Sequence, residues 1–160
     1  MIGQLSSTEI ENVLFDQVVG RIACHYKDEI YIVPISYAYD GKCIYCHAYE
    51  GKKMEIMRQN SRVCFQVDEM KDMSNWKSVI AWGEFEELKE EEKTKALSIL
   101  LKRELPIVSS VTTHLGEAWP FSTDDINELN AIPGIVFRIS LTEKTGKFEK
   151  TSESPLLMFN

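Results

Sequence analysis

The chain has 160 residues, of which 25 are acidic and 18 are basic, so its formal net charge at pH 7 is −7. This charge argues against a broad nucleic-acid or anionic-membrane surface, since either needs an extended positive field. The length supports one hydrophobic core, so we expect a single domain over residues 1–160. The sequence shows no secretion signal and no apolar stretch that could span a membrane, so we expect a cytoplasmic protein.

The first predicted element is a short amphipathic helix. Ser6 and Glu9 have the spacing of a capping box, in which each residue bonds the other's backbone N–H. Apolar residues then recur at helical spacing, namely Ile10, Val13 and Leu14. We expect this apolar stripe to pack on a sheet.

Four strand-like runs follow, rich in β-branched and aromatic residues: GRIACHY, IYIVPISYAY, KCIYCHAY and RVCFQVDE. Between the second and the third, Asp40 and Gly41 are typical of a two-residue type I′ hairpin turn, which needs positive φ at both positions. The turn pairs Tyr39 with Lys42, and its register places Pro34 beside His47 on one face of the sheet.

The segment EGKKMEIMRQN is predicted to form a second helix, with Lys52 and Lys53 in its first turn and Asn60 ending it in a left-handed conformation. A helix N-terminus already carries partial positive charge and unpaired N–H groups. Two lysines there are explained if an anion binds. The alternative is that both lysines are solvated surface charges.

The second half of the chain continues the β pattern. WKSVIAWGEFEEL is predicted as a fifth strand in which Gly83 marks a bulge or a close backbone approach. A helix over Glu90–Glu104 buries four residues, Ala96, Leu97, Leu100 and Leu101. After an irregular segment, Thr123 can start a short helix, and GIVFRISL forms a sixth strand. Six antiparallel strands with peripheral helices predict a mainly β fold, a closed or partly split barrel.

Four cysteines lie within the strand-like runs, and without a secretion signal we expect buried thiols rather than disulfides: Cys24, Cys43, Cys46 and Cys64. Cys43 and Cys46 have C-x-x-C spacing, which also suggests a zinc site. In a strand, however, residues three apart point to opposite faces, so this pair cannot readily close on one ion. We therefore expect no metal.

The succession of the four runs and WKSVIAWGEFEEL resembles the flavin-nucleotide-binding proteins related to pyridoxamine 5′-phosphate oxidase, in particular the branch of nitroimidazole-resistance (Nim) proteins. The resemblance extends over about Ile10 to Lys147. It implies a six-stranded antiparallel split β-barrel that forms a homodimer. It also implies FMN as the cofactor, one molecule in each of two clefts at the subunit interface.

The resemblance also implies which residues hold FMN. The isoalloxazine ring would lie along Pro34, Ile35, Ser36 and Tyr37, largely against backbone groups. The ribityl chain and phosphate would meet His47, Ala48, Gly51 and Lys52, while Lys77 and Ser78 would complete the phosphate site. Lys53 is expected to face water. Arg62, Arg138 and Lys147 are further candidates, and Trp119 and His114 are a candidate wall of the substrate pocket.

The expected function is that of an FMN-dependent oxidoreductase that reduces small nitro compounds such as 5-nitroimidazoles. His47 would bind or protonate the substrate, since histidine titrates near neutral pH; the alternative is a strand histidine satisfied by one hydrogen bond. The chain lacks the C-terminal tryptophan and arginine motif of true pyridoxamine phosphate oxidases, which argues against vitamin B6 oxidation. Two alternatives are a non-catalytic flavin-binding protein and a relative that binds haem or another flavin-like cofactor.

Overall fold

One antiparallel sheet organises the chain. The structure, a computed structural model, describes residues 1–103 and 126–151. Within these ranges the strands are β1 (Ile2–Gln4), β2 (Val19–Tyr26), β3 (Glu29–Ser36), β4 (Ala38–Tyr39), β5 (Cys43–Ala48), β6 (Arg62–Asp72), β7 (Asn75–Glu87) and β8 (Ile135–Glu149). The helices are α1 (Ser7–Asp16), α2 (Lys52–Gln59), α3 (Glu90–Lys102) and α4 (Ile126–Asn130).

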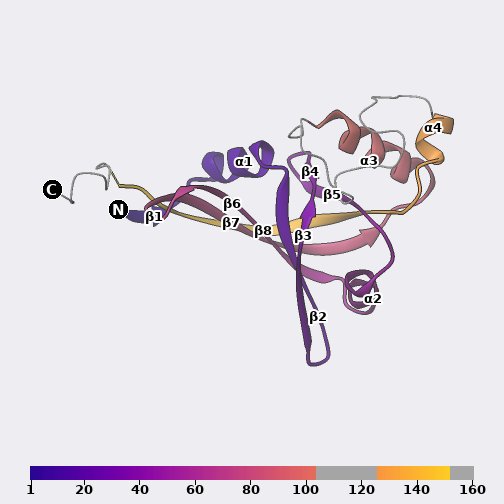
Figure 1. The fold of residues 1–160 in the computed structure, drawn as a ribbon, viewed down its shortest axis with the longest axis horizontal. Coiled ribbons are helices and arrows are strands. Elements are labelled where there is room, and N and C mark those ends of the chain that lie inside the picture. The colour runs from indigo at the N-terminus through magenta and orange to yellow at the C-terminus, as the bar shows by residue number, and fades with distance from the viewer. Residues whose placement is uncertain (104–125, 152–160) are drawn as a thin grey trace.

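The sheet runs in the order β3-β2-β6-β7-β8-β5-β4, and β1 pairs with the end of β8. Its two outermost strands, β3 and β4, are consecutive in the chain and are separated only by Tyr37. The sheet therefore curls back on itself, which confirms the predicted split-barrel class. Figure 1 shows α3 and α4 together at the end of the molecule away from β1.

The strand number is eight in the described ranges rather than the six that we predicted. One reason is that β1 was not recognised. Another is that the run IYIVPISYAY breaks at Tyr37, whose N–H donates to the Val18 carbonyl (2.9 Å) and whose hydroxyl donates to the Leu14 carbonyl (2.8 Å). These two bonds tie Tyr37 to Leu14 of α1 and to Val18, the residue before β2.

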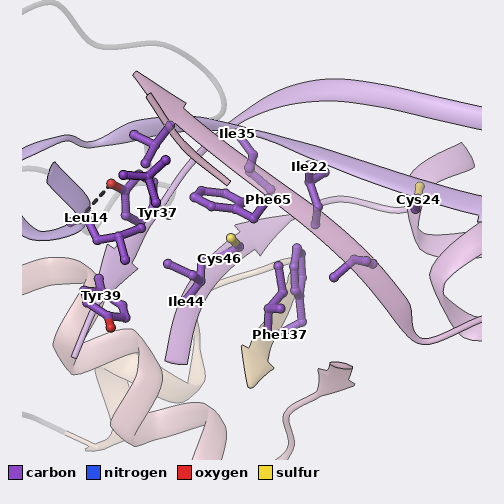
Figure 2. Packing of buried hydrophobic residues seen from close by; sticks show 14 of the residues in the cluster. Leu14, Ile22, Cys24, Ile35, Tyr37, Tyr39, Ile44, Cys46, Phe65 and Phe137 are labelled. Carbon is purple, nitrogen blue, oxygen red and sulfur yellow. Dashed lines mark hydrogen bonds between the residues drawn. The ribbon is translucent and has the colours of Figure 1, made fainter. Parts of the chain in front are cut away.

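The barrel interior is an apolar cluster that α1 closes on one side. The Tyr37 and Phe65 rings pack edge to face with their centroids 5.0 Å apart, and Ile44 and Phe137 are fully buried beside them (Figure 2). The predicted capping box starts α1, since the Glu9 N–H donates to Ser6 Oγ and the Ser6 N–H donates to Glu9 Oε2. Its predicted apolar stripe is buried.

A second apolar cluster covers the other face of β5. The predicted stripe of α3 is buried there, together with Cys43, Tyr45 and Val136. All six residues of β5 are buried, because the barrel interior lies on one side of the strand and this second cluster on the other. Figure 1 shows α3 above β4 and β5.

The predicted register of the Asp40–Gly41 hairpin is wrong by two residues. Tyr39 pairs with Ile44 rather than Lys42. The Asp40 carboxylate accepts from the backbone N–H groups of Lys42 (2.8 Å) and Cys43 (2.7 Å), which holds a longer loop than a two-residue turn.

The predicted contact of Pro34 with His47 is also wrong. Pro34 pairs with Arg21 of β2, whereas His47 pairs with Val136 of β8. The two residues lie in strands from opposite ends of the sheet order, because the hairpin ladder stops at Tyr37.

Two smaller predictions have opposite outcomes. The register of β7 against β8 shifts at Gly83, which confirms the bulge, and a Cβ there would lie 2.4 Å from the Ser140 carbonyl oxygen. Asn60, in contrast, is extended (φ −143°) rather than left-handed. Its side chain instead bridges two neighbours, donating to the His25 carbonyl and accepting from the Arg62 N–H.

Candidate functional site

The predicted ring-binding stretch lies where β3 turns into β4. Pro34 is exposed on the outer face of the sheet, the face opposite the barrel interior. Ile35 and Tyr37 are buried in the inner cluster, so they can offer a ligand backbone groups rather than side chains. Ser36 is 3% exposed, and its Oγ accepts from Arg103 Nη2 at 3.3 Å.

His47 is buried on the outward side of β5. Its Nε2 lies 2.7 Å from the Pro133 carbonyl oxygen, which only accepts, so Nε2 carries the proton and Nδ1 is the free acceptor. Gly134 (φ +101°) passes directly over the ring, where a Cβ would lie 2.5 Å from Nε2. A residue with a side chain would therefore displace the imidazole.

Burial lowers the pKa of His47, and the positive charges of Lys93 and Arg103 lower it further, although the bond to Pro133 acts in the opposite direction. The ring is 3% exposed. This geometry matches the alternative of a satisfied strand histidine. A proton-transfer role would have to use Nδ1.

The two lysines at the start of α2 have different surroundings. Lys52 is exposed, forms an ion pair with Glu29, and places Nζ 5.7 Å from the centre of the Tyr31 ring. Lys53 is half-buried rather than facing water, and its charge reaches the thiols of Cys24 and Cys46. Among the described residues Lys53 makes no ion pair, so it is the lysine with an uncompensated charge.

Gly51 and Ala48 lie beside these lysines. Ala48 packs in the inner cluster at the end of β5. Gly51 is the N-cap of α2 with an extended backbone (φ 168°), and a Cβ there would meet no atom within 4 Å. The fold therefore does not require glycine at position 51, and the space above it is open to a ligand.

Lys77 and Ser78 point to opposite faces of β7, because successive strand residues alternate. Lys77 forms an ion pair with Glu69 (3.6 Å). Ser78 accepts from Gln66 Nε2 at 3.3 Å and lines a groove of about 250 Å³ with Trp76 and Lys147. The structure therefore does not bring the Lys77 and Ser78 side chains together.

The α2 lysines and Ser78 also lie far apart within one chain. Lys52 contacts Glu29, which pairs with Tyr26 at one end of β2, whereas Ser78 lies level with the other end of that strand. Seven residues of strand separate these ends, about 23 Å at 3.3 Å per residue. Lys52 and Ser78 could meet one phosphate only if they came from different copies of the chain.

The other candidate residues are partly paired within the chain and partly outside the described residues. Arg138 is ion-paired with Glu86 and Glu92, and Arg62 begins β6 opposite Glu84. Of the neighbouring aromatic residues, Trp76 donates from Nε1 to Glu149, and Trp82 is half-buried. The two predicted pocket residues, His114 and Trp119, lie outside the described residues.

Sequence reasoning missed Arg103, which directly follows α3. Its Nη2 donates to Ser36, but its Nε and Nη1 are buried without any hydrogen-bond partner. Burial lowers the pKa of Arg103 to about 10, so the group stays charged at pH 7. A cation at a helix C-terminus ordinarily complements the helix dipole, so no pattern in the sequence distinguishes Arg103 from a common capping residue.

A pocket of about 480 Å³ lies beside Arg103. Its walls come from the end of α1, the Tyr37–Tyr39 link and the end of α3, and they include Phe15, Tyr39 and Lys102. This volume falls within the usual range for small-molecule sites. The pocket thus joins aromatic walls to two cationic side chains.

Residues 1–103 and 126–151 contain free cysteines but no metal-ligand cluster and no membrane-spanning helix. All four cysteines are free thiols; Cys24, Cys43 and Cys46 are buried as predicted, whereas Cys64 is half-buried. Cys43 and Cys46 face opposite sides of β5. No group of three histidine, cysteine or acidic side chains in these ranges could hold a metal ion. The described helices include none with the length and hydropathy of a membrane span.

Comparisons with known proteins agree with this fold. Residues 6–148 match the sequence model of a family described as pyridoxamine 5′-phosphate oxidase. The crystal structure of a FAD-binding protein from Mesorhizobium loti is 30% identical, with a TM-score of 0.69, and the match covers 94% of this chain and 99% of that one. A candidate 5-nitroimidazole antibiotic resistance protein from Bacteroides thetaiotaomicron shares the fold, with 19% identity, a TM-score of 0.67, and coverage of 92% and 87%.

A curated relative adds sequence support over a shorter span. An uncharacterized protein of Rhizobium meliloti is 38% identical over 84 residues, which are 52% of this chain. The match covers 56% of that relative, so this chain matches only about half of its length.

Proposed function

This chain belongs to the pyridoxamine 5′-phosphate oxidase family, and on that premise we propose that it is an oxidoreductase that uses FMN bound at a homodimer interface. The observation that carries the proposal is the likeness, at 30% identity over 94% of the chain, to a solved FAD-binding protein. We further propose small nitro compounds such as 5-nitroimidazoles as the substrates, in line with the Nim-like motifs.

The residues present fit a flavin nucleotide. A phosphate dianion needs cationic groups and free N–H donors, and the start of α2 supplies both, with Lys53 uncompensated and Gly51 open above it. The ring carbonyls need donors, and Arg103 has two buried nitrogens without partners beside Ser36. We therefore propose Lys53, together with Lys52, as the phosphate contact.

The outer face of the sheet supports a dimer. Its exposed apolar residues are Ile30 (73% exposed), Ile32 (61%), Val19 (53%) and Ile80 (36%). Exposed apolar residues on one face of a sheet are candidates for contact with another chain. We propose that a second copy covers it, which would also bring Ser78 of one chain toward the α2 lysines of the other.

The bound flavin would supply electron transfer to the substrate, while the protein positions both and excludes water. Tyr37 and Ile35 fix the ring-binding stretch by their burial. His47 is the proposed residue for binding or protonating the nitro group. Because its Nε2 is held by Pro133, Nδ1 is the atom through which it would act.

The central test is the cofactor content of the purified protein. We expect a yellow protein that releases FMN on denaturation, identified by chromatography against FMN and FAD standards. Release of FAD would correct the cofactor, as the Mesorhizobium loti neighbour suggests. Colourless protein that binds neither nucleotide would contradict the proposal.

Two further measurements separate the remaining possibilities. Anaerobic reduction of a nitroimidazole by the flavin-loaded protein and reduced nicotinamide distinguishes an enzyme from a flavin-storage protein. Sedimentation of the loaded protein as a monomer at micromolar concentration would exclude the interface site.

The phosphate contact is tested by a matched pair, Lys52→Ala and Lys53→Ala. A charge-assisted hydrogen bond is worth about 1.5 to 3 kcal/mol, so losing it should weaken FMN by roughly tenfold or more but leave riboflavin, which has no phosphate, unaffected. We expect the larger selective loss for Lys53→Ala, because Lys52 already pairs with Glu29. Equal losses of FMN and riboflavin would mean that the substitution disturbs the fold instead.

A further inference from the structure

The Arg103 guanidinium is the one charged group in the described residues whose buried nitrogens lack partners. Both Nε and Nη1 are enclosed without a hydrogen bond, and only Nη2 is used, on Ser36 Oγ. Burying a charge without a counter-charge is costly, and an unsatisfied buried polar group in a native fold calls for a functional explanation. The fold therefore holds Arg103 at a cost to stability.

No described residue provides a counter-charge for Arg103. Asp16 lines the same pocket, but neither Asp16 nor another described carboxylate forms an ion pair with Arg103. The charge of Arg103 is felt by His47 and Cys46, and neither is a counter-ion, because His47 is neutral and burial raises the pKa of Cys46 to about 12. The described residues therefore supply no acceptor for these two nitrogens.

The position of Arg103 indicates what that acceptor is. Its guanidinium lies against Ser36, within the stretch proposed to run along the flavin ring, and its charge also reaches His47 on β5. Arg103 thus links the two parts of the proposed site that β3 and β5 hold separately. A guanidinium presents a planar fork of donors, which suits a pair of neighbouring acceptors in one plane.

We infer that Arg103 donates to the carbonyl-bearing pyrimidine edge of the bound flavin and binds the reduced cofactor more tightly than the oxidised one. This inference rests on the proposed function. The pyrimidine edge offers adjacent oxygen and nitrogen acceptors, and it gains negative charge when the flavin is reduced. A fixed cation beside it stabilises that charge, and charge near this part of the ring is a known means by which proteins tune flavins.

The test compares flavin affinity and midpoint potential in the wild type, Arg103→Gln and Arg103→Lys, with Lys95→Ala as control. Lys95 is an exposed cation on the same helix, so its removal changes net charge equally without touching the site. We expect Arg103→Gln to weaken the reduced flavin at least tenfold more than the oxidised flavin. For a two-electron couple this ratio lowers the potential by about 30 mV.

Arg103→Lys keeps the positive charge but loses the planar pair of guanidinium donors. Compared with Arg103→Gln, it should restore part of the midpoint potential and a smaller part of the flavin affinity. Lys95→Ala should match the wild type in both. Arg103→Gln could instead bind flavin with an unchanged potential and differ from the wild type only by a higher melting temperature. Arg103 would then have a structural role alone, and the inference would fail while the proposed function stands. If the wild type binds no flavin, the proposed function fails first.

Discussion

The two faces of β5 are both buried, yet they are built from different chemistry. The inward face carries Ile44, Cys46 and Ala48, which pack into the apolar barrel cluster. The outward face carries Cys43, Tyr45 and His47, which α3 and the segment before β8 cover. The inward residues pack among apolar side chains, although the charges of Arg103 and Lys53 reach the Cys46 thiol. On the outward face, His47 lies within reach of the charges of Lys93 and Arg103.

This difference separates stability from function along one strand. Apolar burial is favourable by about 25 cal/mol for each Å² removed from water, whereas buried polar groups are costly unless each is bonded. On the inward face, burial of apolar side chains is favourable and needs no specific hydrogen bond. The outward face needs one specific bond for His47 and leaves Arg103 unsatisfied, which is a pattern that a purely structural layer would not keep.

The largest effect that we predict belongs to the inward face. Ile44 is fully buried, so Ile44→Ala should lower the free energy of unfolding by about 2 to 5 kcal/mol, through lost transfer energy and the cavity left behind. Urea denaturation measures this loss. Met73→Ala, at a side chain that is 85% exposed, is the control and should change stability by less than about 0.5 kcal/mol. A loss below about 1 kcal/mol for Ile44→Ala would contradict the comparison.

Local sequence signals predicted much of the apolar architecture on both faces of the sheet. The capping box of α1, the buried stripe of α3 and the bulge at Gly83 all followed from spacing or residue type, because each depends on neighbours close in the chain or on one backbone requirement. The prediction of the hairpin register was wrong, although the cause is also local in the chain. The Asp40 carboxylate bonds two N–H groups ahead of it, an option that the turn rule for Asp-Gly does not weigh.

The polar contacts of the outward region could not be predicted in this way, because their groups meet only in the folded chain. Arg103 reaches Ser36 across 67 positions, and His47 reaches Pro133 across 86. The lysines of α2 show the same limit. Helical spacing placed both in the first turn, but only the position of Glu29 on the adjoining hairpin shows which one is already paired.

A smaller effect should follow from crowding the outward face. In Gly134→Ala, the new Cβ would sit at φ +101° and 2.5 Å from His47 Nε2, so the backbone is strained and the bond to Pro133 is displaced. We expect a loss of about 1 to 3 kcal/mol in the free energy of unfolding. Gly51→Ala is the matched control, because no atom lies within 4 Å of its Cβ.

The two glycine variants also sharpen the functional side of the comparison. Gly51→Ala should keep its stability but weaken FMN, since the open space above position 51 is where we propose that the phosphate approaches. If Gly134→Ala proves as stable as the wild type, Gly134 is not fixing His47. If Gly51→Ala binds FMN normally, the phosphate lies elsewhere.

The smallest effect, and the most specific to the outward face, is the pH dependence that His47 contributes. Its folded pKa lies below the unfolded value of 6.5, chiefly because burial disfavours the charged ring. The unfolded chain therefore binds the proton first as the pH falls, and the stability contributed by neutral His47 is present above about pH 6.5 and is lost as the pH decreases through the folded pKa. One proton sets the upper limit of this slope at about 1.4 kcal/mol per pH unit.

The measurement is the difference in unfolding free energy between the wild type and His47→Gln from pH 7.5 to 5. The carboxylates whose pKa values are lowered titrate below this window, and they are common to both proteins, so they cancel in the difference. A difference that does not change with pH would show that His47 titrates alike in the folded and unfolded chains, and the outward face would then lose the electrostatic distinction that separates it from the inward one.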